Sequence, residues 1–250
     1  SPLNYFLSNQ VGFGDLNLLP FGGVYTGRLP LLRLRFGSFP DTFDVGIIQT
    51  STNTRRLGAP FDFDTRSTIP RLEVSWGQTV GPLWFDIGAG YNTFEIKDTS
   101  SGNGTRIDSY VFTAALTGEY GPFFFNSSVY FGQNLKNYGF LVRGDSFAHW
   151  NTDTDSIADA DGYGYIAVAG YRYRDLLRFE AGYGYAANDP GFPDGAQTDD
   201  VQSYYLQVLI PIASQFFIVP EIGKIDYKQD SAGNDQGAET YAVIKWQIFL

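Results

Sequence analysis

Along most of the chain, apolar and polar residues alternate over segments of about ten residues, separated by turn-forming residues. A period of two places successive side chains on opposite faces of a β-strand. In the last segment, for example, apolar residues at even positions alternate with Tyr241, Val243, Lys245 and Gln247. Candidate strands lie at residues 29–37, 42–51, 70–79, 82–96, 108–119, 122–138, 164–174, 177–188, 201–213, 215–228 and 238–250. The pattern predicts an all-β protein with about eleven strands, or twelve if residues 3–14 add one.

The connections between these strands alternate between short and long. Short turns contain Gly, Pro, Asp or Ser, as in GQTVGPLW and GEYGPFF. Long polar loops are expected at residues 51–69, 97–107, 139–163, 188–200 and 229–237. Short turns at one end and long loops at the other are typical of outer-membrane barrels, with periplasmic turns and extracellular loops.

Aromatic residues indicate which face of the strands points outward. A soluble barrel would turn its apolar face inward, and alternation alone does not distinguish the two cases. Tyr and Phe cluster near strand ends, as in PFFF and QSYY, which favours the two aromatic girdles of a lipid-facing band. We predict one domain over residues 1–250, a transmembrane antiparallel up-and-down β-barrel.

Composition and charge exclude several classes of protein. No run approaches the roughly 18 apolar residues that a transmembrane helix requires. The net charge of −10 argues against nucleic acid as a partner, because phosphate binding needs a basic face. Cysteine is absent, which excludes a disulfide framework, a thiolate nucleophile and a cysteine metal site.

Two stretches carry a resemblance to a known family. The closing segment YAVIKWQIFL resembles the C-terminal strand of bacterial outer-membrane proteins, although Leu250 stands where most of that class have Phe. The stretch LPFGG, followed by RLPLLRLRF, resembles the part of sixteen-stranded proteobacterial porins in which strand five leads into the long third loop and returns as a basic sixth strand. The resemblance covers the whole chain, but its specific motif is this stretch alone.

The resemblance implies a specific organisation. Residues 1–28 would be the end of strand five plus the constriction loop, and residues 29–250 would be strands six to sixteen, so a complete barrel would need further strands upstream. It also implies a homotrimer in the outer membrane of a Gram-negative bacterium, in contact with membrane lipid and lipopolysaccharide.

The polar faces of the strands would line the lumen. They carry charged groups that cannot fill a dry core, because burying unpaired charge costs several kcal/mol or more. Basic residues prevail there, whereas acidic residues gather in the loops. The candidate pore-lining residues are Arg33, Arg35, Arg71, Glu73, Arg172, Arg178 and Lys245.

These residues predict an outer-membrane porin for passive diffusion of small hydrophilic solutes, with a preference for anions such as small carboxylates. Rings of Arg and Lys select anions because they replace part of the hydration that a permeating carboxylate loses. The structural alternative is that the arginines pair with Glu73, Glu180 and Asp86 and only shape the lumen. A second function remains open, that of a structural or adhesive barrel acting through its extracellular loops.

Other candidate sites in the sequence are weaker. The acidic residues Asp153, Asp155, Asp159 and Asp161 are a weak calcium candidate, because their spacing misses the EF-hand rule. His149 is the only histidine and has no distinctive serine motif around it, so we expect no enzyme and no cofactor. The charged loop 52–68 could be solvated, fold inward or pack on a neighbouring subunit.

Overall fold

The computed structural model describes residues 3, 29–140, 142, 144–174, 176–191 and 196–248. Within them, eleven strands follow one another as an antiparallel meander, each paired with the next wall strand along the chain. They are β1 (Leu31–Ser38), β2 (Asp41–Ile48), β4 (Arg71–Val80), β5 (Leu83–Asp98), β6 (Gly104–Tyr120), β7 (Phe123–Gln133), β10 (Asp161–Tyr173), β11 (Leu177–Asp189), β12 (Asp199–Ala213), β13 (Phe216–Asp226) and β14 (Ala238–Ile248). The predicted all-β, up-and-down architecture is therefore confirmed.

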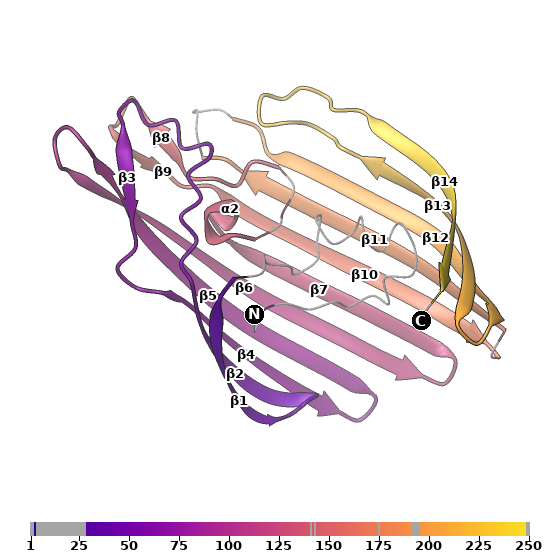
Figure 1. Ribbon diagram of the computed structural model, residues 1–250. Coiled ribbons are helices and arrows are strands. Elements are labelled where there is room, and N and C mark those ends of the chain that lie inside the picture. The colour runs from indigo at the N-terminus through magenta and orange to yellow at the C-terminus, as the bar shows by residue number, and fades with distance from the viewer. Residues whose placement is uncertain are drawn as a thin grey trace.

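The sheet bends into a trough (Figure 1). Among the described residues, β1 and β14 are each paired on one side alone, so this sheet is open. The constriction loop predicted within residues 1–28 lies outside the described residues, apart from Leu3, and so does Leu250. No helix among the described residues is long and apolar enough to cross a membrane.

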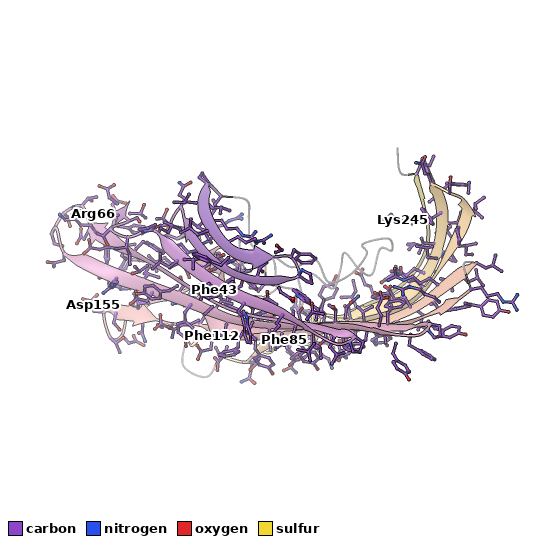
Figure 2. All side chains as sticks on the ribbon, turned by 90° about the horizontal axis from the view of Figure 1, so that it is seen from below. Phe43, Arg66, Phe85, Phe112, Asp155 and Lys245 are labelled. Carbon is purple, nitrogen blue, oxygen red and sulfur yellow. The ribbon has the colours of Figure 1, made fainter. Side chains whose placement is uncertain are left out.

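Apolar side chains cover the outer, convex face of the sheet. On β4, Leu72, Val74 and Trp76 are exposed, whereas Arg71 and Glu73, which point to the other face, are fully buried. Figure 2 shows Phe112 on the outer side of the trough and Lys245 on its inner side. Exposed Leu, Ile, Phe and Trp combined with buried charge is the reverse of a soluble barrel. The outer face is therefore suited to lipid and the inner face to water.

The structure adds short elements that the sequence pattern did not predict. They are β3 (Phe63–Arg66), which pairs with the far end of β5, the hairpin β8 (His149–Asn151) and β9 (Ser156–Ala158), and the one-turn helix α2 (Leu135–Tyr138). The strand predicted over 122–138 ends early, at Gln133, because Asn134 has a left-handed backbone (φ 51°) and α2 follows. This is a correction to the predicted boundary.

Candidate channel wall

A basic pair faces inward from β1. Arg33 and Arg35 lie two residues apart, so they share a face, and Asp44 is the register partner of Arg35 on β2. Arg35 binds the Asp44 carboxylate with two hydrogen bonds of 2.9 Å, and Arg33 binds it as well. Both arginine side chains remain about one-third exposed or more, while Asp44 is buried. Two cations share one anion, so this cluster keeps one net positive charge.

Arg71 and Glu73 point to the predicted inner face but lie beneath α2. Arg71 Nε is 3.4 Å from the Glu73 carboxylate, and both side chains are fully buried. Arg71 also donates a 2.7 Å hydrogen bond to the Tyr138 carbonyl, and its guanidinium stacks 4.8 Å from the centroid of that tyrosine ring. This pair is therefore covered by α2 and does not face an open lumen.

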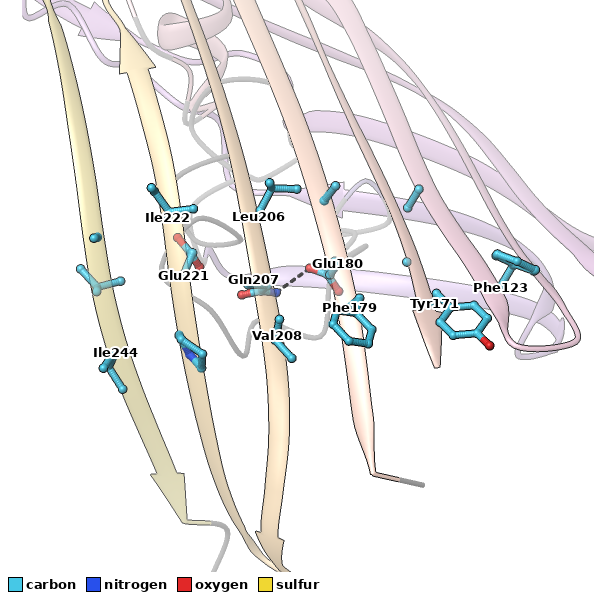
Figure 3. A pocket seen from close by; sticks show the side chains of 16 residues that line it. Phe123, Tyr171, Phe179, Glu180, Leu206, Gln207, Val208, Glu221, Ile222 and Ile244 are labelled. Atoms are coloured by element: carbon cyan, nitrogen blue, oxygen red, sulfur yellow. Dashed lines mark hydrogen bonds between the residues drawn. The ribbon is translucent and has the colours of Figure 1, made fainter. Parts of the chain in front are cut away.

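A second buried carboxylate organises the wall at β11 and β12. Arg178 donates to Glu180 at 2.5 Å, and Tyr205 and Gln207 both donate to the other oxygen of Glu180 at 2.6 Å. Figure 3 shows the bond between Glu180 and Gln207 from neighbouring strands. The positive charge of Arg178 is balanced within this network.

Arg172 forms a third pair near the short turns. It donates two hydrogen bonds, of 2.9 and 2.6 Å, to Glu119 at the end of β6. The guanidinium groups of Arg172 and Arg178 lie 5.0 and 4.2 Å from the centroid of the Phe124 ring. Stacking on an aromatic face holds both arginines along the wall.

Bulky rings on the inner face lie over glycines on the adjacent strand. Tyr205 is the register partner of Gly182, and a Cβ atom built on Gly182 would lie 2.1 Å from the Tyr205 ring. Tyr241 lies over Gly223, its register partner, in the same way. Such pairs let the rings lie flat against the wall and keep them out of the lumen.

Lys245 completes the set of candidates and lies half-buried on the inner face of β14. Four residues earlier on the same face of β14, Tyr241 donates a 2.8 Å hydrogen bond to Glu221. Sequence reasoning did not single out Asp44 or Glu119 as partners of the arginines. The period of two would have put Asp44 on the right face, but only the strand register places it opposite Arg35.

The connection from β2 to β4 packs against the connection from β7 to β10, over the ends of β5 and β6. Leu57 and Trp150, one from each connection, join a buried apolar cluster with Phe94 of β5 and Ile107 of β6. The Trp150 amide donates a 2.7 Å hydrogen bond to the Leu57 carbonyl. The predicted charged loop 52–68 thus contains a buried anchor and β3, although Arg55 and Arg56 are exposed.

An ion cluster joins the same two connections. Arg56 donates a 2.9 Å hydrogen bond to Asp145, and His149 Nε2 lies 3.6 Å from the other oxygen of that carboxylate. Partial burial alone would raise the pKa of Asp145, but His149 and Arg56 together lower it to about 2. Ser146 is the nearest serine in sequence, and its buried hydroxyl makes no hydrogen bond to this histidine.

The acidic stretch shows no metal-site geometry. Asp153 and Asp155 are exposed, and Asp159 accepts a 2.6 Å hydrogen bond from Asn134. Within the part of the chain that the structure describes, no three His, Cys, Asp or Glu side chains are grouped to hold a metal ion.

A shallow hollow of about 890 Å³ lies over β10 to β14. Small residues such as Ala169 and Ala181 line it, together with the larger Phe179, Leu206 and Ile222 (Figure 3). Those side chains belong to the outer apolar face. The hollow therefore suits apolar groups, whereas the charged groups that could meet a hydrophilic solute lie on the opposite face.

Comparison with solved structures agrees with this architecture. The outer membrane channel DcaP of Acinetobacter baumannii matches with a TM-score of 0.74 and 14% identity, covering 99% of this chain and 69% of DcaP. OmpF of Salmonella typhi has a TM-score of 0.53 and 13% identity, over 88% of this chain and 61% of that one. OmpT of Vibrio cholerae has a TM-score of 0.50 and 16% identity, over 88% and 64%.

No protein-family model and no curated protein matches the chain. The chain spans 69% of the length of DcaP and less than two-thirds of the length of OmpF and OmpT. DcaP is described as an outer membrane channel and OmpT as an outer-membrane protein, and the likeness extends over most of this chain. The described residues have the fold of an outer-membrane porin barrel and account for a large part of its wall.

Proposed function

We propose that this chain forms most of the wall of a porin in the outer membrane of a Gram-negative bacterium. Its function is passive diffusion of small hydrophilic solutes, without catalysis. The observation that carries this proposal is the distribution of side chains, with an exposed apolar outer face and a charged, hydrogen-bonded inner face. A wide barrel with a polar interior is an aqueous channel, whereas a narrow barrel is filled by its side chains.

The selectivity proposed is a preference for anions, small carboxylates among them. Three of the arginines on the inner face are each balanced by one carboxylate, Glu73, Glu119 or Glu180. The cluster of Arg33, Arg35 and Asp44 is different, because it carries one net positive charge and its arginines are partly exposed. A permeating anion would gain most from this cluster.

The assembly proposed is a barrel completed by further strands and associated as a homotrimer, surrounded by membrane lipid and lipopolysaccharide. The two open edges of the described sheet and the 61–69% coverage of similar proteins support additional strands. The trimer follows from the resemblance of the sequence to sixteen-stranded porins. Mass measurement of the full-length protein in detergent tests it, since a monomer of folded protein would contradict it.

The deciding experiment is the reversal potential of full-length protein in a planar bilayer under a salt gradient. We expect the sign of an anion-selective channel, and a shift towards neutrality in the double variant Arg33→Ala/Arg35→Ala. The matched control, Arg33→Lys/Arg35→Lys, keeps both charges and should keep the selectivity. Folded, inserted protein without conductance would contradict the porin and favour a barrel acting through its loops.

A further inference from the structure

The connection from β7 to β10 turns back onto the concave face of the sheet. The described residues of 134–148, which we call the inner segment, include α2. In α2, Leu135 and Tyr138 are fully buried and pack in one apolar cluster with Val111 and Tyr130, inner-face residues of β6 and β7. Figure 1 shows α2 lying against this part of the wall. The inner segment is therefore packed inside the trough.

Buried side-chain amides fix the inner segment at both ends. Asn134 donates a 2.8 Å hydrogen bond to the carbonyl of Asp108 on β6. Asn137 donates to the Asn53 carbonyl and accepts from the Ala148 amide, each at 2.7 Å. Asn134 and Asn137 are fully buried, so breaking these hydrogen bonds without replacing them by bonds to water would cost free energy. A solvated loop would not need such contacts.

Tyr138 anchors the inner segment to the wall. Its hydroxyl donates a 2.8 Å hydrogen bond to Glu73, and its carbonyl accepts the 2.7 Å bond from Arg71. A hydrogen bond to a buried carboxylate is stronger than one between neutral groups. The buried pair on β4, Arg71 and Glu73, therefore holds Tyr138 in place.

Several wall positions beneath the inner segment are glycines. A Cβ atom built on Gly90 of β5 would lie 2.0 Å from the Tyr138 hydroxyl oxygen. Cβ atoms built on Gly132 and Gly162 would each lie 2.9 Å from the Leu135 side chain, and the one on Gly132 would also lie 2.1 Å from the Tyr110 carbonyl oxygen. These glycines leave room for the two buried side chains of α2. Wall and inner segment are complementary in shape as well as in hydrogen bonding.

We propose that the inner segment is a fixed constriction that narrows the channel on its β4 to β7 side, with Tyr138 and Glu73 as positioning residues. The inference rests on the proposed function, because a constriction has meaning only where solutes pass. It differs from the constriction expected within residues 1–28, since it comes from another connection. The same packing withdraws Arg71 from the lumen.

A thiol reporter tests the packing independently of transport. The chain contains no cysteine, so Ser146→Cys introduces a single thiol. Ser146 is fully buried and its hydroxyl has no hydrogen-bond partner, so the substitution removes no side-chain hydrogen bond. Full-length folded protein in lipid vesicles is treated with a membrane-impermeant maleimide. We expect much slower labelling than for Ser101→Cys in an exposed turn.

Two variants then release the anchor. Tyr138→Phe removes the hydroxyl that binds Glu73, and Gly90→Ala inserts a methyl group beneath it. We expect labelling of Cys at position 146 to accelerate about tenfold or more in each variant, since a buried hydrogen bond to a charged group is lost or displaced. Single-channel conductance should rise in the same variants.

Matched controls make the same chemical changes elsewhere on the wall. Tyr205→Phe removes a tyrosine hydroxyl from Glu180, and Gly182→Ala crowds the Tyr205 ring. Both should leave the labelling rate unchanged. Fast labelling of the Ser146→Cys protein with its anchor intact would contradict the packing. Faster labelling in the anchor variants without higher conductance would contradict the constriction. If neither the unmodified protein nor any variant conducts ions while the labelling rates follow the expected pattern, the porin and constriction proposals both fail. The packing of the inner segment is then still supported.

Discussion

At the scale of single residues, carboxylates decide how much of the arginine charge reaches the lumen. Glu73, Glu119 and Glu180 each serve one arginine, and two of these carboxylates are fully buried. Asp44 serves Arg33 and Arg35 together. Because charge near a wide aqueous lumen acts within a Debye length of about 8 Å at physiological salt, the unbalanced cluster should dominate selectivity locally.

Removing the shared carboxylate should therefore strengthen anion selectivity. Asp44→Asn keeps the size of the side chain but leaves both guanidinium groups uncompensated. We expect the reversal potential to move further in the anion-selective direction, opposite to the effect of removing the arginines. The difference should shrink at high salt. An unchanged reversal potential would show that this cluster lies outside the conduction path.

The sequence predicted which face each of these residues occupies, because the period of two fixes it. The pairing was only partly predictable. Glu73 and Glu180, predicted as possible partners of the arginines, bind Arg71 and Arg178. The partner of Arg172 is Glu119, which lies at the end of β6, 53 positions away in the chain. Such a partner is set by the order of strands in the sheet, which alternation does not encode.

At the scale of elements, long alternating strands were predictable and short irregular elements were not. The three-residue strands β8 and β9 contain too few residues to show a period. The sequence pattern predicts residues 135–138 as the end of a strand, because a helix of four residues is too short to show a period of its own. Its inward course depends on contacts with distant strands.

The packing between the β2–β4 connection and the β7–β10 connection should loosen in acid. The pKa of Asp145 lies at about 2 in the folded protein, below its ordinary 3.8. A lowered pKa contributes stability that is complete above the unfolded value and is lost as the pH falls from about 4 through about 2, amounting to no more than about 2 kcal/mol. Hydrogen exchange of amides 144–151, corrected for intrinsic rates, should report faster opening over that range.

Two variants serve as controls for this pH dependence. Asp145→Asn should exchange faster already at neutral pH and change little between pH 4 and pH 2, because its titrating group is gone. Arg56→Ala should have a smaller effect, since the Arg56 side chain is 61% exposed and exposed ion pairs contribute about 1 kcal/mol or less. Equal acid sensitivity in Asp145→Asn and the unmodified protein would assign the opening to another group.

At the scale of the whole molecule, the wall separates two solvents. The apolar outer face and the polar inner face follow directly from the alternation in the sequence, and the fold was predicted because that alternation runs through nearly every strand. What the sequence could not supply is the content of the trough, since the packing of the inner segment depends on glycines and carboxylates from several strands.

A charge introduced on the outer face should destabilise the barrel far more than a charge introduced on the inner face. Ile87 on β5 is half-exposed on the outer face, and Thr117, on the adjacent strand β6, belongs to the inner set. We expect Ile87→Arg to destabilise the barrel by up to about 2–4 kcal/mol, depending on its depth, whereas Thr117→Arg should cost much less. Denaturant unfolding in lipid vesicles measures both. Equal losses would contradict the assignment of faces.

The rings that lie over glycines make the bore of this channel a property of residue pairs. Enlarging Gly182 alone pushes Tyr205 into the passage, and trimming Tyr205 alone leaves Glu180 without one of its donors. In each such pair, a glycine and a ring on neighbouring strands together fill a fixed volume. Widening the passage by design therefore requires changing both residues of a pair together. Natural widening should likewise proceed by paired substitutions, in which a residue on one strand becomes larger as its partner on the next strand becomes smaller.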